Sequence, residues 1–319
     1  MRVTAVVVTY NRLKLLKECI EALLAQTYSE MDILVVNNNS TDGTQEYLVE
    51  LTEKNKKVKN LSLPENIGGS GGFYEGIKYA IRNNPDWLWL MDDDTIPERD
   101  ACKELCNAVT VIDDKIGFLS SNVYGMQHEC MNTPRMKFQQ KGENGYADWN
   151  MHLDKSLVKV NSATFCACFV STDAVRNVGL PIKEYFIWGD DTEYTLRLSR
   201  YYGQGWLVGK SLVLHKRVNG QSLSIKNEDN PNRINVYYYY VRNYLINVKL
   251  YYYGYLGALA KTLHFDLIIL QILFGKSKYK CKKIGILFKG IFAFWFRCYD
   301  TNSVKNRMNY FQDNNEKQE

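Results

Sequence analysis

Short apolar runs alternate with segments of helical periodicity over the first 123 residues. The β-branched run Val3–Thr9 predicts a buried strand, and apolar positions three and four apart within Leu13–Gln26 predict an amphipathic helix. The same alternation predicts strands at 32–37, 58–63, 87–91 and 116–123, and helices at about 44–54, 71–83 and 98–112. This order predicts an α/β fold on a mostly parallel, doubly wound sheet. Such sheets bind ligands beyond the carboxyl ends of their strands, so the loops after the first four strands should converge on one crevice.

The pattern changes twice after residue 123. Residues 124–156 are rich in Gly, Asn and Met and predict an irregular excursion, followed by a strand at 158–170, a short helix at 190–202 and a strand at 206–215. From residue 232 the apolar positions have helical spacing. We therefore expect one domain over 1–230, with halves at about 1–123 and 124–230, and a C-terminal helical extension over 231–319.

Composition and charge separate the two regions. The whole chain is 45% hydrophobic and 24% charged, as in ordinary globular proteins. Residues 231–319 carry a net charge of +9. Because the whole chain carries +5, the first 230 residues carry −4. Residues 231–319 also hold 12 of the 23 tyrosines. A basic, aromatic-rich tail predicts an anionic partner surface. No nucleic-acid recognition motif accompanies it, so nucleic acid is the least favoured partner.

The eight cysteines and the N-terminus indicate a cytosolic protein. The cysteines are scattered, with no four-ligand zinc spacing, and we interpret them as reduced, mostly buried thiols. The chain enters a strand at once, without the apolar run of a signal peptide.

Three consecutive acids, Asp92, Asp93 and Asp94, follow the apolar strand that ends at Met91. Adjacent carboxylates repel one another, and their burial is costly unless a cation or hydrogen-bond donors offset it. Hard divalent cations prefer carboxylate oxygens, so these acids are candidate metal ligands. The alternative is a polar turn closed by Pro97.

A glycine-rich segment opens the helix after the third strand. Asn66 is followed by glycines at 68, 69, 71 and 72, which allow close approach of a ligand to a helix N-terminus that favours anions. The segment fits neither the dinucleotide fingerprint nor the P-loop. A tight turn without ligand is the alternative.

A second acidic cluster, Asp190 to Glu193, starts the helix predicted at 190–202. These acids could simply cap the helix, and Glu193 with Arg197 could be an ordinary pair on one helix face. A carboxylate at a helix N-terminus is also kept ionised and ready to accept a proton. Trp188 offers a ring on which a sugar could stack, and His215 leaves a strand end where the site is expected.

These motifs occur in an order that resembles inverting family 2 glycosyltransferases, which have the GT-A (Rossmann-like) fold and use nucleotide-diphosphate sugars with a divalent metal. The motifs are Thr9–Arg12, Val36–Thr44, the triple Asp, Asp190–Glu193 and His215. Within that family, the segments 66–73 and 188–191 look most like bacterial galactofuranosyltransferases, including the mycobacterial arabinogalactan enzymes. The resemblance covers about residues 3–217.

The resemblance implies a role for each position. Asp191 would be the general base, Asp94 and His215 with Asp92 would bind Mn²⁺ or Mg²⁺, and Trp188 and Asp190 would contact the acceptor sugar. Residues 1–123 would form the nucleotide-sugar half of the catalytic domain, and 124–230 the acceptor half. The implied donor-binding residues are Thr9, Tyr10, Arg12, Asn38, Asn66, Gly68, Gly69, Gly71, Gly72, Asp92 and Asp93.

The implied reaction is a single displacement with inversion, which needs one metal-stabilised leaving group and one positioned base. The leading hypothesis is transfer of galactofuranose from UDP-galactofuranose to a cell-surface glycan, lipid-linked and carried for example on polyprenyl diphosphate. Alternatives are a rhamnosyltransferase that uses dTDP-rhamnose, a sugar-nucleotide-binding protein without catalysis, and a nucleotidyltransferase. A polysaccharide synthase is disfavoured because no Gln-x-x-Arg-Trp motif is present.

The tail predicts attachment to a membrane surface. Its apolar runs, Leu263–Phe274 and Ile284–Phe296, are shorter than the about 18 residues needed to span a bilayer. Aromatic residues with lysines at the margins suit helices that lie among lipid headgroups. We expect a cytoplasmic protein, peripheral on the inner face of the membrane. The alternative is a helical subdomain that packs on the catalytic domain or on a partner.

Overall fold

The computed structural model describes residues 1–136, 144–217 and 223–297, so the last 22 residues of the predicted tail lie outside it. The described residues form two compact units. The first contains residues 1–183 and 191–217, and the second contains 184–190 and 223–297. The segment 184–190 belongs to the second unit, although it lies within the domain expected over 1–230.

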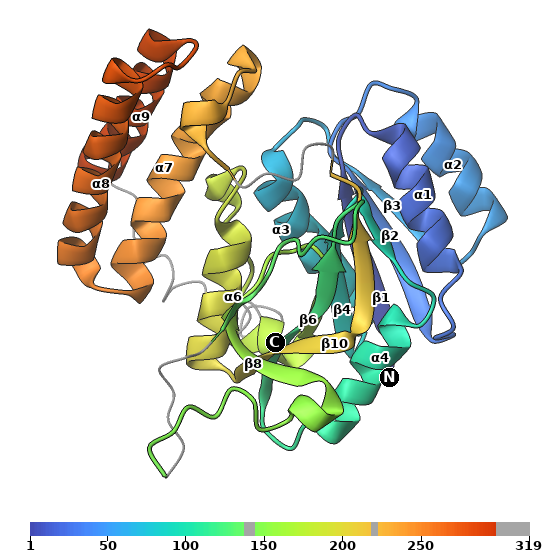
Figure 1. Ribbon diagram of the computed structural model, residues 1–319. Helices are drawn as coiled ribbons and strands as arrows, with labels where there is room; N and C mark the ends of the chain where they lie inside the picture. Colours follow the sequence, from blue (N-terminus) through green and yellow to red (C-terminus); the bar gives the residue numbers. More distant parts are fainter. Residues whose placement is uncertain (137–143, 218–222, 298–319) are drawn as a thin grey trace, which may run out of the picture. The chain divides into compact units, whose positions relative to one another are not determined.

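The first unit is built on one mixed sheet of ten strands with the order β3-β2-β1-β4-β9-β6-β10-β8-β7, in which β5 pairs with β10 (Figure 1). The strands are β1 (Val3–Thr9), β2 (Met31–Asn37), β3 (Val58–Ser62), β4 (Trp87–Asp92), β5 (Thr95–Pro97), β6 (Ile116–Tyr124), β7 (Arg135–Met136), β8 (Leu157–Ser162), β9 (Cys168–Ser171) and β10 (Gln204–His215). β1, β2, β3 and β4 run parallel, as predicted. Thr9 of β1 pairs with Asn37 of β2, and Val8 pairs with Asp92 of β4, so these three strands end at one level.

Helices cover both faces of the sheet, which confirms the predicted doubly wound α/β architecture. They are α1 (Leu13–Leu24), α2 (Thr44–Lys54), α3 (Gly68–Ala80), α4 (Ala101–Val111), α5 (Thr172–Val178) and α6 (Asp190–Tyr201). Alternate residues of β1 face opposite layers: Ala5 and Val7 pack among residues of α1 and α4, whereas Val6 and Val8 pack among residues of α3 and α6. The two-residue period of the strand thus supplies both cores.

One of the predicted strands is divided into two strands in the structure. The run 158–170 was expected to be a single strand, but β8 and β9 are separate, and β9 runs antiparallel between β4 and β6. The break lies at residues 163–167, where Thr195 of α6 both donates to the carbonyl of Ala163 and accepts from its N–H, each at 3.1 Å. Ala167 has a positive φ of 66°, which a regular strand does not allow. Apolar composition alone does not reveal such a break.

The second unit contains three helices that share their own apolar core: α7 (Pro231–Tyr251), α8 (Gly254–Phe274) and α9 (Lys280–Phe296). Asn230 accepts hydrogen bonds from the N–H groups at 232 and 233, and Pro231 occupies the first helical turn, where its missing N–H costs nothing. The expectation that the apolar runs are too short to span a bilayer was wrong for α8. By length and composition this helix alone, among the described residues, could cross a membrane, although one such helix is weak evidence.

Candidate active site

The carboxyl end of β4 places two acids in a buried, cross-linked position. Asp93 and Asp94 are only 3% and 6% exposed. Thr9, at the end of β1, donates its hydroxyl to Asp93 Oδ2 at 2.7 Å. The guanidinium of Arg12, in the loop after β1, lies 2.8 Å from Asp94 Oδ2 and 3.3 Å from Asp93 Oδ1. Donors from the neighbouring strand therefore offset the repulsion between these carboxylates.

The two acids have different protonation properties. Burial raises the pKa of Asp93 to about 6 despite the charge of Arg12 and the hydroxyl of Thr9. Burial also acts to raise the pKa of Asp94, but interaction with His215 and Arg12 outweighs it and lowers that pKa below its ordinary value. In turn, burial would lower the pKa of Arg12, but the three acids raise it. Asp94 is therefore the more firmly ionised of the two.

His215 reaches Asp94 because β5 and β10 pair antiparallel, with His215 opposite Thr95 and the backbone N–H of Lys216 bonded to the carbonyl of Asp94. His215 Nε2 lies 3.2 Å from Asp94 Oδ1, an oxygen that is buried without an aligned hydrogen-bond donor. His215 Nδ1 lies 2.8 Å from Oδ1 of Asn132, whose Nδ2 donates to Thr164. Because an amide oxygen only accepts, Nδ1–H donates to Asn132, and Nε2 is the ring nitrogen that faces the carboxylate.

The loops that follow β1 and β2 are tied together. Asn11 receives a hydrogen bond from the N–H of Thr41 at 2.7 Å, and its own N–H donates to Ser40. Asp42 accepts from the N–H of Leu13 at 2.9 Å. These polar residues of two predicted loops therefore build a single rim, which confirms that the loops converge.

The glycine-rich segment is explained mainly by packing. A Cβ at Gly72 would lie 2.5 Å from Val8 Cγ1, and one at Gly71 would lie 2.7 Å from the side chain of Ile67. The segment is fastened to the end of β2, since Asn38 donates to the carbonyl of Gly68 and accepts from the N–H of Ile67. Gly69, in contrast to Gly71 and Gly72, has open space on its Cβ side and leaves room for a ligand.

Asp191 lies in the first turn of α6 and accepts a hydrogen bond from the backbone N–H of Thr192. The positive end of the helix dipole favours its negative charge. Burial raises the pKa of the Cys166 thiol, and the charges of Asp92, Asp94 and Asp191 raise it further. The charge of Asp191 therefore acts on the same buried thiol as the charges of Asp92 and Asp94.

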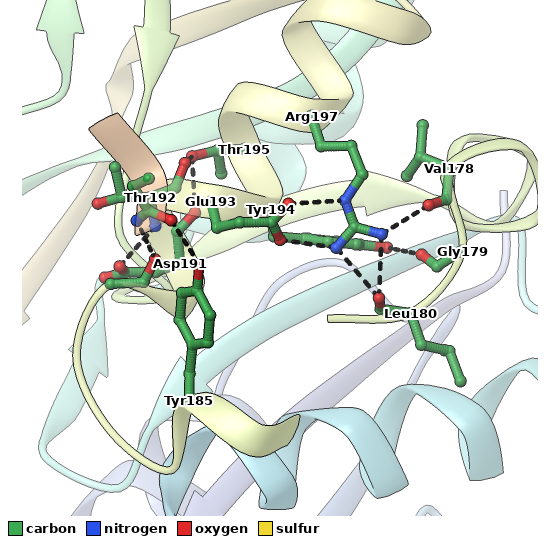
Figure 2. Close-up of polar contacts among 12 residues, drawn as sticks. Val178, Gly179, Leu180, Tyr185, Asp191, Thr192, Glu193, Tyr194, Thr195 and Arg197 are labelled. Carbon is green, nitrogen blue, oxygen red and sulfur yellow. Dashed lines mark hydrogen bonds and ion pairs between the residues drawn. The ribbon is translucent and has the colours of Figure 1, made fainter. Parts of the chain in front are cut away.

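The pair Glu193–Arg197 is not an ordinary surface pair. Both side chains are fully buried, and the guanidinium binds the carboxylate through two contacts, at 2.7 and 3.1 Å (Figure 2). The same guanidinium donates to the carbonyls of Val178 and Leu180, at the end of α5 and just beyond it. The pair therefore joins α6 to the preceding loop inside the protein.

The residues predicted to contact an acceptor belong to the second unit. Trp188 packs edge-on against Tyr237 and Tyr240, and Arg233 lies over its ring at 5.9 Å from the centroid. Asp190 is buried at the start of α6. Much of the Trp188 ring is therefore engaged by the protein itself.

A cavity of about 590 Å³ lies away from these residues, at the amino ends of β1 and β4, with Arg2, Asp86 and Arg176 in its lining. It contains none of the predicted site residues. We assign no ligand to it.

Comparison with known proteins identifies the family. Residues 4–169, more than half of the chain, match glycosyl transferase family 2. The chain belongs to this family. The galactofuranosyltransferase GlfT1 of Mycolicibacterium smegmatis is 26% identical over 211 residues, which cover 62% of this chain and 65% of the relative. A poly-β-1,6-N-acetyl-D-glucosamine synthase of Staphylococcus aureus is 29% identical over 99 residues, or 31% of this chain and 23% of that protein.

Solved structures show the same fold at low identity. The crystal structure of S. aureus TarS 1–349 has a TM-score of 0.58 at 15% identity and covers 99% of this chain and 92% of that one. GalNAc-T7, solved with UDP, GalNAc and Mn²⁺, has a TM-score of 0.56 at 17% identity and covers 76% of this chain and 51% of that one. The predicted GT-A fold is therefore confirmed. The matched part spans less than two thirds of the curated relatives' length.

The predicted metal ligands of this glycosyltransferase are brought together in part. Asp94 and His215 meet, but the described residues contain no group of three His, Cys, Asp or Glu side chains that could hold an ion, so Asp92 does not complete a trio. Two protein ligands still suit a divalent cation that takes its remaining oxygens from a nucleotide. Asp94 Oδ1 and His215 Nε2 are the two atoms that would hold such an ion, and Asn132 orients the imidazole.

Most predicted donor residues have protein partners as well. Thr9, Arg12 and Asn38 bind other side chains or backbone, and Asn66 accepts from the N–H of Gly68. Tyr10 is 45% exposed. Their contact with a donor stays a prediction. Asn132 is not among the predicted site residues: it lies in the irregular excursion 124–156, and its role depends on a histidine far away in the sequence.

Proposed function

We propose that this protein is a metal-dependent, inverting glycosyltransferase that moves galactofuranose from UDP-galactofuranose to a hydroxyl of a cell-surface glycan. The pair Asp94–His215, in which the buried Asp94 Oδ1 faces an imidazole oriented by Asn132, is the observation that carries the proposal. The galactofuranosyltransferase relative supports the donor. The solved complex of TarS with UDP-GlcNAc supports a UDP-sugar in this fold.

In this proposal, Asp94 and His215 would hold Mn²⁺ or Mg²⁺, and the bound ion would stabilise negative charge on the departing diphosphate. Arg12 keeps Asp94 ionised and restrains the loop after β1. Asp191 accepts the proton of the acceptor hydroxyl as that oxygen attacks the anomeric carbon. The helix dipole keeps this carboxylate ionised until then. One base and one metal suffice for a single displacement with inversion.

The acceptor in this proposal is lipid-linked, for example on polyprenyl diphosphate, and the protein is peripheral on the cytoplasmic face of the membrane. Six leucines of α8 are each at least 48% exposed and recur three or four residues apart: Leu256, Leu259, Leu263, Leu267, Leu270 and Leu273. The lysines at 276, 278, 280 and 282 follow this stripe and match anionic headgroups.

Nucleoside-diphosphate release tests the proposal. The protein is incubated with UDP-galactofuranose or dTDP-rhamnose, with an octyl galactofuranoside as acceptor, with and without Mn²⁺. We expect UDP release and an acceptor that gains one hexose, both dependent on Mn²⁺. Release of dTDP alone would favour the rhamnosyltransferase, transfer of a nucleotide would favour a nucleotidyltransferase, and binding of UDP-sugar without turnover would favour a non-catalytic protein.

A further inference from the structure

The segment that leads into Asp191 has an unusual backbone. Phe186 and Trp188 have positive φ angles of 64° and 63°, and Gly189 has a φ of 92°. A bulky side chain at positive φ is strained and persists only where the surroundings impose it. Two such residues in so short a stretch, directly before a candidate catalytic helix, indicate that something holds this segment.

Two asparagines on one face of α7 hold it. The side-chain amide of Asn243 shares its hydrogens among the carbonyls of Tyr185, Ile187 and Trp188, at 3.0, 3.1 and 2.8 Å. Four residues further on, Asn247 donates to the carbonyl of Gly189 at 2.8 Å.

The hydrogen bonds of both asparagines are buried and tightly packed. Asn243 and Asn247 are 0% and 4% exposed. The hydroxyl of Tyr185 donates to Asn247 Oδ1 at 2.7 Å, which orients that amide toward Gly189. A Cβ at Gly189 would lie 3.4 Å from both asparagine side chains. Arg242 adds a hydrogen bond to the carbonyl of Glu184 at 2.7 Å, so the segment is fixed from its first residue onward.

We propose that Asn243 and Asn247 are positioning residues of the transferase reaction. They hold the left-handed backbone of 186–189, the segment that leads directly into α6, whose second residue is Asp191. The inference rests on the proposed role of Asp191 as the base. The two asparagines would give the second unit a positioning role in the reaction, in addition to its proposed attachment to the membrane.

The expected effect is on turnover. A displacement of a reacting group by about 1 Å can cost about 100-fold in rate. Asn243→Ala removes three backbone contacts, so kcat for UDP release should fall about 100-fold, while KM for UDP-galactofuranose stays within about threefold. Hydrogen exchange in peptides that cover 184–194 should become faster.

The matched control is Thr262→Val. Thr262 is also buried in the second unit, and its hydrogen bonds go to the carbonyl of Ala258 and to Nε1 of Trp295, which lie in α8 and α9. This variant should lower Tm without changing kcat or exchange at 184–194. If Asn243→Ala does not fold, Asn247→Ser, which removes fewer contacts, takes its place.

Two results would overturn the inference. In the first, the asparagine variants and Thr262→Val lose the same Tm and have equal kcat and equal hydrogen exchange at 184–194. In the second, kcat falls and KM for UDP-galactofuranose rises by the same factor. The proposed function fails separately, if the wild-type protein releases no nucleoside diphosphate. The exchange comparison then still shows whether the two asparagines hold the segment.

Discussion

At the scale of single residues, neighbours in the sequence have different environments. Asp93 is closed in by Thr9 and Arg12, and its pKa rises to about 6. Asp94, one residue on, faces His215 and Arg12, which lower its pKa. The sequence shows the run of acids but not which one keeps a free coordination position, because that depends on the partners brought by β1 and β10.

Asp191→Asn tests the base. The amide keeps the volume of the carboxylate but cannot accept a proton, so turnover should fall at least 1,000-fold, within the range typical of general-base catalysis, about 10²–10⁴. Binding of UDP, measured by calorimetry, should be nearly unchanged. Equal turnover in wild type and variant would reject this role. Asp173→Asn, in the first turn of α5, is the matched control and should be silent.

Asn132→Ala tests the orientation of His215. Without the acceptor on Nδ1, the imidazole loses its fixed tautomer, and partners of this kind typically contribute 10–100-fold to metal affinity. We expect Mn²⁺ affinity, titrated by electron paramagnetic resonance with UDP present, to fall about that much. Asn150→Ala alters an exposed asparagine of the same excursion and should bind as the wild type does. Unchanged Mn²⁺ binding in Asn132→Ala would contradict the assignment of the site.

At the scale of elements, the fold divides into predictable and unpredictable parts. The strands and helices of the first 123 residues follow from local periodicity, since each buries its own apolar positions. The break between β8 and β9, and the insertion of β9 between β4 and β6, depend on contacts such as Thr195 with Ala163 that lie 32 residues apart. The pairing of β5 with β10, which joins Asp94 to His215, is likewise long-range. Asp94 and His215 were therefore predicted as a pair only through the family resemblance, because nothing in the local sequence shows that they come together.

The buried ion pair Glu193–Arg197, which links α6 to the loop after α5, gives a prediction about stability. Arg197→Met leaves Glu193 buried without its cation, which typically costs about 3–5 kcal/mol. The double variant Glu193→Leu with Arg197→Met should recover a large part of this loss, because no unpaired charge remains. Chemical unfolding of the single and double variants measures both. A double variant no more stable than the single one would show that the hydrogen bonds to Val178 and Leu180 matter more than the ion pair.

At the scale of the whole molecule, α8 is apolar on the side that faces α7 and α9 and also on its exposed side. A helix of this kind needs a second apolar environment, which a membrane surface supplies. We predict that the double variant Leu263→Ser with Leu267→Ser lowers co-sedimentation with vesicles of 30% anionic lipid by at least tenfold, since each exposed leucine removed loses about 1.5–3 kcal/mol of burial. Val49→Ser, at a residue of α2 that is 47% exposed, is the control and should bind as the wild type does.

The same variants separate a lipid surface from a second copy of the chain. Their leucines are spaced three and four residues apart, which would also suit a helical seam between two chains. If the stripe docks on lipid, wild type and double variant have the same mass in solution by light scattering, and vesicle binding weakens as salt is raised, because the lysines after α8 contribute electrostatic attraction. If the double variant instead converts a dimer to a monomer and vesicle binding is unchanged, the membrane proposal is wrong, and the acceptor need not be lipid-linked.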